Sequence, residues 1–357
     1  MKDDKEKILN VIKEKFDNKR ISFPKESIDF EIEEESKEIV MKMSNSILNT
    51  NMQDNAVCFE GWAFALHVHY ENKKYGIKLA FQENLNEQIE KKCKDPKTGK
   101  YSFCGENKGH INRFLYRALR FSEQYEWFSL SKDISKYVES FKEYIYNDRL
   151  SFVNNLPSDN NEKNDKNTEA YKITENFIES IFENNQFKAT SWSESVSDDG
   201  SFYRQLPVGL FEGKDDKKKR VFTGGKSAID LWSCKDDTLN IFELKYDNKM
   251  IGIITEIFFY CNFVKDMYCK AMKTFKCNMD VKSGRGFKKL RSGRFTKING
   301  YMLCDKDNLH PLIDKELIDE MNKITKRNDN DNKCTINYDK ILYKVDNILC
   351  NVTILKK

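Results

Sequence analysis

The sequence predicts a mixed α/β protein built in two parts. At 357 residues, the chain is long enough for two ordinary domains. After residue 170, apolar residues follow helical and strand periods in the order helix, three strands, helix, strand, which is typical of a mixed sheet flanked by helices. Before residue 154, helical and strand patterns also alternate, and a polar stretch with almost nothing to bury separates the two parts.

These observations predict three segments. Residues 1–153 form an N-terminal α+β domain, for which we expect a role in substrate recognition or regulation. Residues 154–169 form a polar linker, and residues 170–357 form a second domain with a mixed sheet.

Composition excludes several classes of protein. Charged residues make up 33% and aromatic residues 13% of the chain, which argues against wholesale disorder. No apolar run approaches the roughly 20 residues that span a bilayer, and the N-terminus lacks the apolar core of a signal peptide. The ten cysteines are scattered without a disulfide framework. We therefore expect a cytoplasmic protein without a membrane partner.

The elements of the N-terminal part are predicted in order. The first sixteen residues are amphipathic and predict a helix. Alternation at Ile28, Phe30 and Ile32 predicts a half-buried strand. His67 and His69 alternate on an apparent strand, and without a third ligand nearby they are interpreted as ordinary strand residues. Cys93, Cys104 and His110 have a spacing that matches no common zinc pattern.

Three arginines recur along one side of the helix predicted around residues 110–128. Arg113, Arg117 and Arg120 have the spacing i, i+4, i+7. One interpretation is a solvated face that pairs with nearby glutamates. The alternative is a face that contacts phosphates, because the guanidinium group suits phosphate geometry.

The second part begins with an amphipathic helix around residues 170–184. A strand follows in which Pro207 indicates an edge or a bulge, because proline cannot donate to a sheet ladder. Two strands then lie between residues 228 and 245. A long apolar segment from residue 251 predicts a buried helix, residues 298–305 predict another strand, and the C-terminal residues predict strands at the sheet edge.

The two strands between residues 228 and 245 contain charged residues inside apolar runs. If Asp236 and Asp237 form a two-residue turn, Asp230 lies directly opposite Glu243. Opposed residues have Cβ atoms about 5 Å apart, and Lys245 projects from the same face as Glu243. The register therefore predicts a cluster of two carboxylates and one ammonium group.

Two interpretations account for this cluster. Close carboxylates repel each other, and a divalent cation such as Mg²⁺ or Mn²⁺ would remove the repulsion by taking their oxygens as ligands. The alternative is a buried salt bridge between Lys245 and one carboxylate, which leaves the other carboxylate without a compensating charge. We favour the metal site, because unpaired carboxylates are rarely buried.

An Asp on one strand and a Glu-x-Lys on the next, followed by a helix and a further strand, resemble the PD-(D/E)xK nuclease superfamily. The resemblance covers residues 168–305 and implies a restriction-endonuclease-like fold. It implies a Mg²⁺-dependent nuclease, most closely a DNA endonuclease, in which Asp230 and Glu243 bind the metal and Lys245 assists the attacking water. Ile229 stands where the superfamily often has proline, a departure that leaves the ligand in place.

The resemblance also suggests auxiliary residues. Some members carry Gln-x-x-x-Tyr on the helix after the motif, and this chain has Glu256 and Tyr260 at those positions, with Glu in place of Gln. A plain helix carboxylate and a core tyrosine are the alternative. Some members place a Glu on the first helix, and both Glu175 and Glu179 are candidates.

A basic segment at residues 281–297 is the candidate surface for nucleic acid. It holds seven Lys or Arg residues, no acidic residue, and two phenylalanines, Phe287 and Phe295, that we expect to be available for stacking. A merely solvated basic loop is the alternative. The predicted nucleic-acid-binding residues are Lys226, Arg285, Lys288, Lys289, Arg291 and Arg294.

The sequence thus predicts a nucleic acid partner, with DNA favoured over RNA, and a candidate homodimer. A second hypothesis is a nucleic-acid-binding or assembly module with a nuclease-like fold that is inactive without a partner. Retention of Asp230, Glu243 and Lys245 argues against this second hypothesis.

Overall fold

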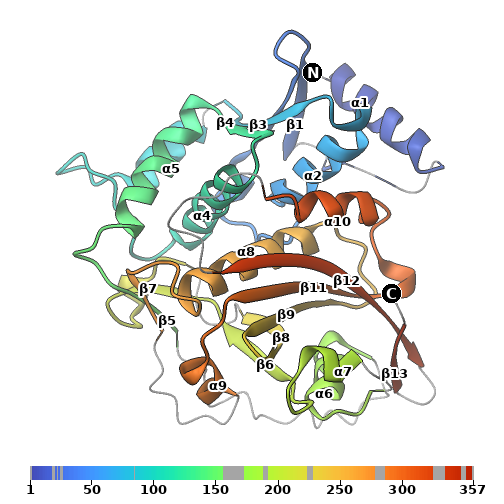
Figure 1. Cartoon of the computed structure of the whole chain (residues 1–357). Coiled ribbons are helices and arrows are strands. Elements are labelled where there is room, and N and C mark those ends of the chain that lie inside the picture. The colour runs from blue at the N-terminus through green and yellow to red at the C-terminus, as the bar shows by residue number, and fades with distance from the viewer. Residues whose placement is uncertain are drawn as a thin grey trace.

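The computed structural model describes most of the chain (Figure 1). The described residues are 2–17, 21, 23–24, 27–83, 85–155, 173–187, 192–222, 228–277, 286–324, 334–346 and 351–355. The helices are α1 (Lys2–Lys15), α2 (Phe59–His69), α3 (Leu85–Cys93), α4 (Gly109–Gln124), α5 (Lys132–Ile145), α6 (Glu175–Glu183), α7 (Trp192–Val196), α8 (Gly252–Met267), α9 (Phe287–Ser292) and α10 (Lys315–Met321).

The strands of the described residues form three open sheets, so the predicted mixed α/β class is confirmed. The first sheet has the order β1-β2-β3-β4 and the second the order β10-β5-β7. The third has six strands in the order β13-β12-β11-β9-β8-β6. The strands are β1 (Ile28–Glu33), β2 (Glu38–Met43), β3 (Gly76–Phe81), β4 (Phe128–Leu130), β5 (Phe152–Asn154), β6 (Tyr203–Pro207), β7 (Leu210–Glu212), β8 (Ala228–Lys235), β9 (Thr238–Lys245), β10 (Phe275–Lys276), β11 (Lys297–Asp305), β12 (Thr335–Asp346) and β13 (Asn351–Ile354).

Strand β9 lies inside the six-stranded sheet. It pairs antiparallel with β8 and parallel with β11, and seven of its eight residues are buried. A strand covered on both faces usually carries apolar residues at nearly every position, whereas β9 also buries Asn240, Glu243 and Lys245. The predicted edge strands are confirmed, because β6 with Pro207 and the C-terminal β13 are the two outer strands.

Helices cover both faces of this sheet (Figure 1). Trp232 and Ile241, a cross-strand pair of β8 and β9, belong to the large core that includes α8. The next pair, Leu231 and Phe242, belongs to a smaller core that includes residues of α6. Adjacent residues of a strand point to opposite faces, so the two-residue period of the hairpin sends its side chains alternately toward α8 and toward α6.

The large core also joins α8 to the N-terminal part of the chain. Helix α2 packs against α8, and a Cβ on Gly252 would lie 1.8 Å from the carbonyl oxygen of Gln53. The absence of a side chain at Gly252 therefore permits this close approach. The predicted linker stays a prediction, because its residues 156–169 lie outside the described residues.

The strand predicted for His67 and His69 is wrong, since both residues lie on α2. All residues of this helix are buried. A helix that is apolar on every side lacks an amphipathic period, and its aromatic residues imitate the composition of a strand. The predicted strand at Ile28, Phe30 and Ile32 is confirmed as β1.

Both interpretations of the arginine row need correction. Arg113, Arg117 and Arg120 on α4 are 5%, 2% and 4% exposed, so they are neither a solvated face nor a surface for phosphates. Arg117 donates two hydrogen bonds of 2.6 Å to Glu60, and Arg120 contacts Asp266 at 2.7 Å. The expected pairing with carboxylates is present, but it lies inside the core between α4, α2 and α8.

None of the helices in the described ranges is both long and apolar enough to cross a bilayer.

The buried pair of Arg117 and Glu60 generates a prediction about stability. Glu60 also accepts a hydrogen bond from Thr255, and Arg117 donates to the carbonyl of Val57. We expect Arg117→Ala to lower the free energy of unfolding by about 3–5 kcal/mol, because it leaves the Glu60 carboxylate buried without a counter-ion. Urea denaturation followed by fluorescence measures the change.

The matched control is Lys315→Ala on α10. Lys315 forms an i, i+4 pair with Asp319, and its side chain is 85% exposed. Its removal should change stability by at most about 0.5 kcal/mol, since exposed pairs are screened by solvent. Equal losses in the two variants would contradict the interpretation.

Candidate functional site

The predicted register of the β8–β9 hairpin is confirmed. Five pairs run from Lys235–Thr238 to Leu231–Phe242, and Asp236 and Asp237 form the turn. Asp236 has a φ of 51°, in the left-handed region that tight hairpin turns require. Because the register is fixed, residues 230, 243 and 245 lie on the face of the hairpin that carries Trp232 and Ile241.

Asp230 meets β9 through its side chain, one residue beyond the last ladder pair. The backbone N–H of Leu244 donates a hydrogen bond of 2.9 Å to Oδ2 of Asp230. The carboxylate of Asp230 is therefore hydrogen-bonded to the backbone of β9 and lies beside the Glu243–Lys245 segment. The residue Asp230 is partly exposed, but its carboxylate is enclosed by the protein.

Lys245 forms ion pairs with two carboxylates, one on β9 and one on α8. Its Nζ lies 2.5 Å from Oε1 of Glu243 and 2.9 Å from Oε2 of Glu256 on α8. Glu243, Lys245 and Glu256 are 2%, 6% and 3% exposed. Oε2 of Glu243 has no hydrogen-bond partner among the described residues. The salt bridge considered from the sequence therefore exists, but one lysine faces two buried carboxylates, so at least one of them must bind a proton or another cation.

Helix α8 brings the second auxiliary residue to the same cluster. Tyr260 follows Glu256 by four residues, so both side chains share one face of α8. Burial, followed by the negative charges of Glu243, Glu256 and Asp230, raises the pKa of Tyr260 well above its usual value. The two predicted auxiliary positions on this helix thus face the cluster together.

Helix α6 contributes both candidate glutamates, each to a different neighbour. Oε2 of Glu179 accepts hydrogen bonds of 2.9 Å from Nε of Arg204 and from Nε2 of Gln205. Oε1 of Glu175 accepts a hydrogen bond of 3.1 Å from the N–H of Tyr246. Glu179 is the more buried of the two.

The contacts of Arg204 and Gln205 with Glu179 were not predicted from the sequence. Gln205 has a φ of 57°, and the β6–β8 ladder pairs Arg204 with Leu231 and Leu206 with Ile229 while skipping it. The pairs on either side of Gln205 keep the same register, so no residue is inserted; this is a local distortion of the ladder rather than the bulge that Pro207 suggested, and the edge position is the feature that occurs. The distortion lies opposite Asp230, and the side chain of Gln205 there donates to Glu179.

The protonation of the cluster reflects its excess of acids. Burial, opposed by Lys245 and reinforced by Glu179 and Glu256, raises the pKa of Asp230 to about 7. Burial and then the charges of Asp230 and Glu256 raise the pKa of Glu243 well above its usual value. Burial alone would lower the pKa of Lys245, but Glu243, Glu256 and Asp230 together raise it well above its usual value. Lys245 therefore stays charged at neutral pH.

The donor set fits a hard divalent cation. Asp230 and Glu243 are carboxylates on adjacent strands, and Glu243 has a buried oxygen without a hydrogen bond among the described residues. Mg²⁺ is usually held by one or two carboxylates, with water and substrate phosphates completing its shell. Asp230 and Glu243 could therefore hold such an ion, with Glu256 as a third carboxylate nearby.

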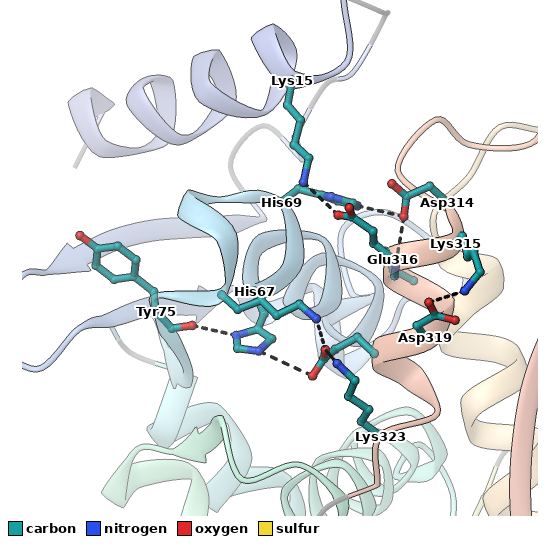
Figure 2. Close-up of polar contacts among 12 residues, drawn as sticks. Lys15, His67, His69, Tyr75, Asp314, Lys315, Glu316, Asp319 and Lys323 are labelled. Carbon is teal, nitrogen blue, oxygen red and sulfur yellow. Dashed lines mark hydrogen bonds and ion pairs between the residues drawn. The ribbon is translucent and has the colours of Figure 1, made fainter.

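A second cluster of potential ligands lies where α10 meets α2 (Figure 2). Within the described ranges, His69, Asp314 and Glu316 are the one group of three such side chains whose ligand atoms all lie within 4.8 Å. Each already has a protein partner. Nε2 of His69 lies 3.1 Å from the carbonyl oxygen of Leu312, Asp314 caps α10 through the N–H of Leu317, and Lys15 contacts Glu316 at 3.1 Å.

The ammonium group of Lys15 lies beside Glu316, where it supplies positive charge to the cluster (Figure 2). We therefore interpret this second cluster as a polar attachment of α10 to α1 and α2. The neighbouring His67 has a comparable role, since its Nδ1 lies 2.8 Å from the carbonyl oxygen of Tyr75 and its Nε2 lies 3.8 Å from Glu320.

The predicted basic segment differs from the expected flexible loop. Its residues 287–292 form α9. Phe287 and Phe295 are 4% and 6% exposed, so the prediction that they are available for stacking is wrong. Their apolar surface packs into the large core, and the ring of Phe287 lies 6.4 Å from that of Trp232. Helix α9 therefore lies on the face of β8 that carries Asp230.

The predicted nucleic-acid-binding residues have mixed outcomes. Lys289 contacts Asp199 at 2.7 Å, and Arg294 is exposed. Lys226 and Arg285 lie outside the described residues, as do the side chains of Lys288 and Arg291.

Comparisons of the chain with protein-family models, with curated proteins and with solved structures find no match in any of the three.

The raised pKa of Asp230 generates a prediction about pH. In the folded protein its pKa is about 7, against an ordinary value of 3.8, so between about pH 4 and 7 the folded state holds a proton that the unfolded chain has released. Without metal, stability should therefore fall as the pH rises through this window. Asp230→Asn should reduce the fall, because it removes this titration and also one charge that raises the pKa of Glu243.

Urea midpoints measured in EDTA at several pH values test this expectation. The asparagine can still accept the hydrogen bond from Leu244 through its amide oxygen. Asp148→Asn, a change at an exposed residue after α5, is the control and should keep the profile of the parent protein. An unchanged fall in Asp230→Asn would contradict the assignment.

Proposed function

We propose that this protein is a metal-dependent nuclease with a restriction-endonuclease-like core of the PD-(D/E)xK type. The observation that carries the proposal is the cluster of Asp230, Glu243 and Lys245 on one face of two central strands. The order of elements around it supports the same proposal, because α6 precedes the hairpin and α8 and β11 follow it. A cluster of titratable groups with strongly shifted pKa values is a feature of functional sites.

In this proposal each residue has a distinct role. Asp230 and Glu243 would hold Mg²⁺ or Mn²⁺, which supplies an activated water and neutralises charge on a phosphate. Lys245 stays protonated, so it acts as a fixed positive charge and hydrogen-bond donor toward the phosphate rather than as a base. Glu256 keeps the Lys245 ammonium in place from the side of α8.

Glutamate at position 256 favours the metal hypothesis over a purely structural salt bridge. A glutamine there would leave Lys245 and Glu243 as a matched pair of charges. With Glu256, one lysine faces two carboxylates within 2.9 Å, and Asp230 adds a third to the cluster. Buried carboxylates in excess of their counter-ions must either take up protons, as the raised pKa of Glu243 indicates for the metal-free protein, or be compensated by a cation.

The proposed substrate is a nucleic acid, with DNA favoured over RNA. Exposed Arg294, together with the basic segment around α9, supports this choice, because phosphates attract clustered lysines and arginines. Cleavage by a homodimer is compatible with this proposal, and sedimentation of the chain with and without DNA tests it.

The alternative is a nucleic-acid-binding module that does not cleave. The contacts of Lys245 with Glu243 and Glu256 support this alternative, because they occupy the ammonium group in the absence of substrate. The two hypotheses differ in whether cleavage depends on Glu243 and on a divalent ion.

A cleavage assay tests the proposal. The full chain is incubated with supercoiled plasmid, linear duplex, single-stranded DNA and RNA in Mg²⁺ or Mn²⁺. We expect Glu243→Gln to reduce the cleavage rate at least about 100-fold, because it removes a metal ligand and changes the contact of Lys245. The variant should fold, since it relieves the repulsion between Glu243 and its neighbouring carboxylates.

The control for this assay is Glu183→Gln. Glu183 lies on α6, is 41% exposed and contacts Arg204 at 3.7 Å. It should cleave at the parent rate. Equal rates in parent and Glu243→Gln, or no cleavage of any substrate by the parent, would argue against the nuclease.

Metal binding is expected to be measurable without any substrate. A ligand that binds only the folded state at 100 times its Kd stabilises that state by about 2.7 kcal/mol. Mn²⁺ should therefore raise the denaturation midpoint of the parent protein and leave that of Glu243→Gln nearly unchanged.

Glu316→Gln distinguishes the two carboxylate clusters. It removes an exposed carboxylate from the group of His69 and Asp314 and leaves Glu243 intact. The Mn²⁺ effect should persist in this variant. Its loss in Glu316→Gln, with persistence in Glu243→Gln, would place the ion at the other cluster.

A further inference from the structure

Positive charge is concentrated in one segment of the chain. Residues 270–297 contain ten Lys or Arg residues and one acidic residue. The whole chain has a net charge of only +4, so the remaining residues carry a net negative charge of −5. A local excess of this size marks a surface for a polyanion more clearly than the overall charge does.

Two adjoining pockets lie along this segment. One, of about 680 Å³, lies between the end of α8 and the starts of β11 and β12. The other, of about 640 Å³, lies between α8, β10 and α9. Tyr268 and Lys270 line both, so the two pockets adjoin, and together they are called the depression below.

The cations of this depression are available to a ligand. The described residues that line it include no aspartate or glutamate, and they include five cations, namely Lys270, Lys273, Lys276, Arg294 and Lys297. All five are exposed. Lys297 lies 3.6 Å from Asp237, whereas the structure gives the other four no ion pair with any described residue.

The aromatic side chains of the depression are largely covered. Tyr268, Phe275 and Phe295 are 4%, 3% and 6% exposed. They shape the walls but offer no open ring on which a base could stack. The accessible chemistry is therefore that of lysine and arginine, which contacts backbone phosphates without reading sequence.

The depression lies at the opposite end of the central strands from the carboxylate cluster. Lys297 pairs with Thr238 at the start of β9, and Met302 pairs with Glu243. The two positions are five steps apart along the strand, which corresponds to about 17 Å at roughly 3.3 Å per residue.

We propose that this depression, defined by Lys270, Lys273, Lys276, Arg294 and Lys297, anchors the phosphate backbone of a polynucleotide at the end of the central strands away from the carboxylate cluster, with Lys297 about 17 Å along the strands from Glu243. The inference rests on the proposed nuclease function for the position of cleavage, but the binding surface itself does not. A concave site accepts a nucleic acid strand better than the flat surface of an anionic membrane.

The separation sets a minimum length for the substrate. Each strand of a duplex advances about 3.4 Å per nucleotide along the axis. A substrate that engages both sites must therefore extend about five nucleotides from the cleaved bond on one side. Cleavage efficiency should rise at this length and then level off.

Salt dependence of binding provides the main test. The full chain is titrated with a labelled 30-base-pair duplex of mixed sequence in EDTA, which prevents cleavage, over a range of salt concentrations. The slope of log K against log salt is about −0.9 per phosphate neutralised. The triple variant Lys270→Ala, Lys273→Ala and Lys276→Ala should therefore bind more weakly and lose about 2.7 units of slope.

The matched control replaces three exposed lysines on α3 and the following turn, Lys91→Ala, Lys97→Ala and Lys100→Ala. It removes the same charge from another surface and should retain the parent slope. Equal slopes in the parent and the first triple variant, or equal losses in the two triple variants, would overturn the anchor. A third result would also overturn the anchor: the parent binds phosphatidylserine vesicles, and the first triple variant loses this binding while it still binds the duplex like the parent.

A second pair of measurements separates this inference from the proposed function. Glu243→Gln should bind the duplex with the parent slope, because Glu243 is not part of the depression. If the parent never cleaves but the triple variant loses slope, the nuclease fails and the anchor stands. If the parent cleaves and the triple variant cleaves and binds equally well at every length, the anchor fails and the nuclease stands.

Discussion

The contact of Lys245 with Glu243 and Glu256 is the constraint on which the rest of the site depends. It joins a central strand to the helix that covers it, and all three residues are at most 6% exposed. Glu256 can reach Lys245 only if the first turns of α8 lie close to β9. A Cβ on Gly252 would lie 1.8 Å from the carbonyl of Gln53, so the N-terminal part of the chain fixes the start of this helix. The position of a proposed catalytic residue thus depends on packing between parts of the chain that are distant in sequence.

Two buried ionic clusters in this molecule differ in a way that bears on function. Glu60 has one arginine and one threonine as partners, and its two oxygens both accept hydrogen bonds. The charges of Glu60 and Arg117 balance each other, so a structural role explains this pair. At Lys245, one cation faces several carboxylates, and an oxygen of Glu243 lacks a hydrogen-bond partner among the described residues. Replacing a buried ionic group by apolar residues is often neutral or stabilising, so an unbalanced cluster is poorly explained by stability.

Features that depend on the local period of the sequence were predicted correctly, whereas features that depend on the tertiary environment, such as burial, were not. The two-residue turn at Asp236 and Asp237 fixes which residues share a face, and the confirmed register follows from counting. The arginines of α4 carry the same polar signal whether they lie in water or against Glu60, so their burial could not be predicted from spacing. For Phe287 and Phe295 the error was the opposite one: they were predicted to be exposed because the surrounding residues are basic and include glycines, but both rings belong to the core. His69 was misplaced because a helix buried on all sides has no amphipathic period.

The distribution of charge along the central strands relates the two proposed sites to each other. Carboxylates gather near the end of β9, and the cations of the depression gather beside its start. A polynucleotide would be attracted to the basic end and repelled from the acidic end until a divalent ion neutralises the carboxylates. Outside residues 270–297 the chain is net negative, which further confines a polyanion to that surface. Binding and metal-dependent access to the carboxylates are then separate steps, because the groups that attract the strand are not the groups that must hold the ion.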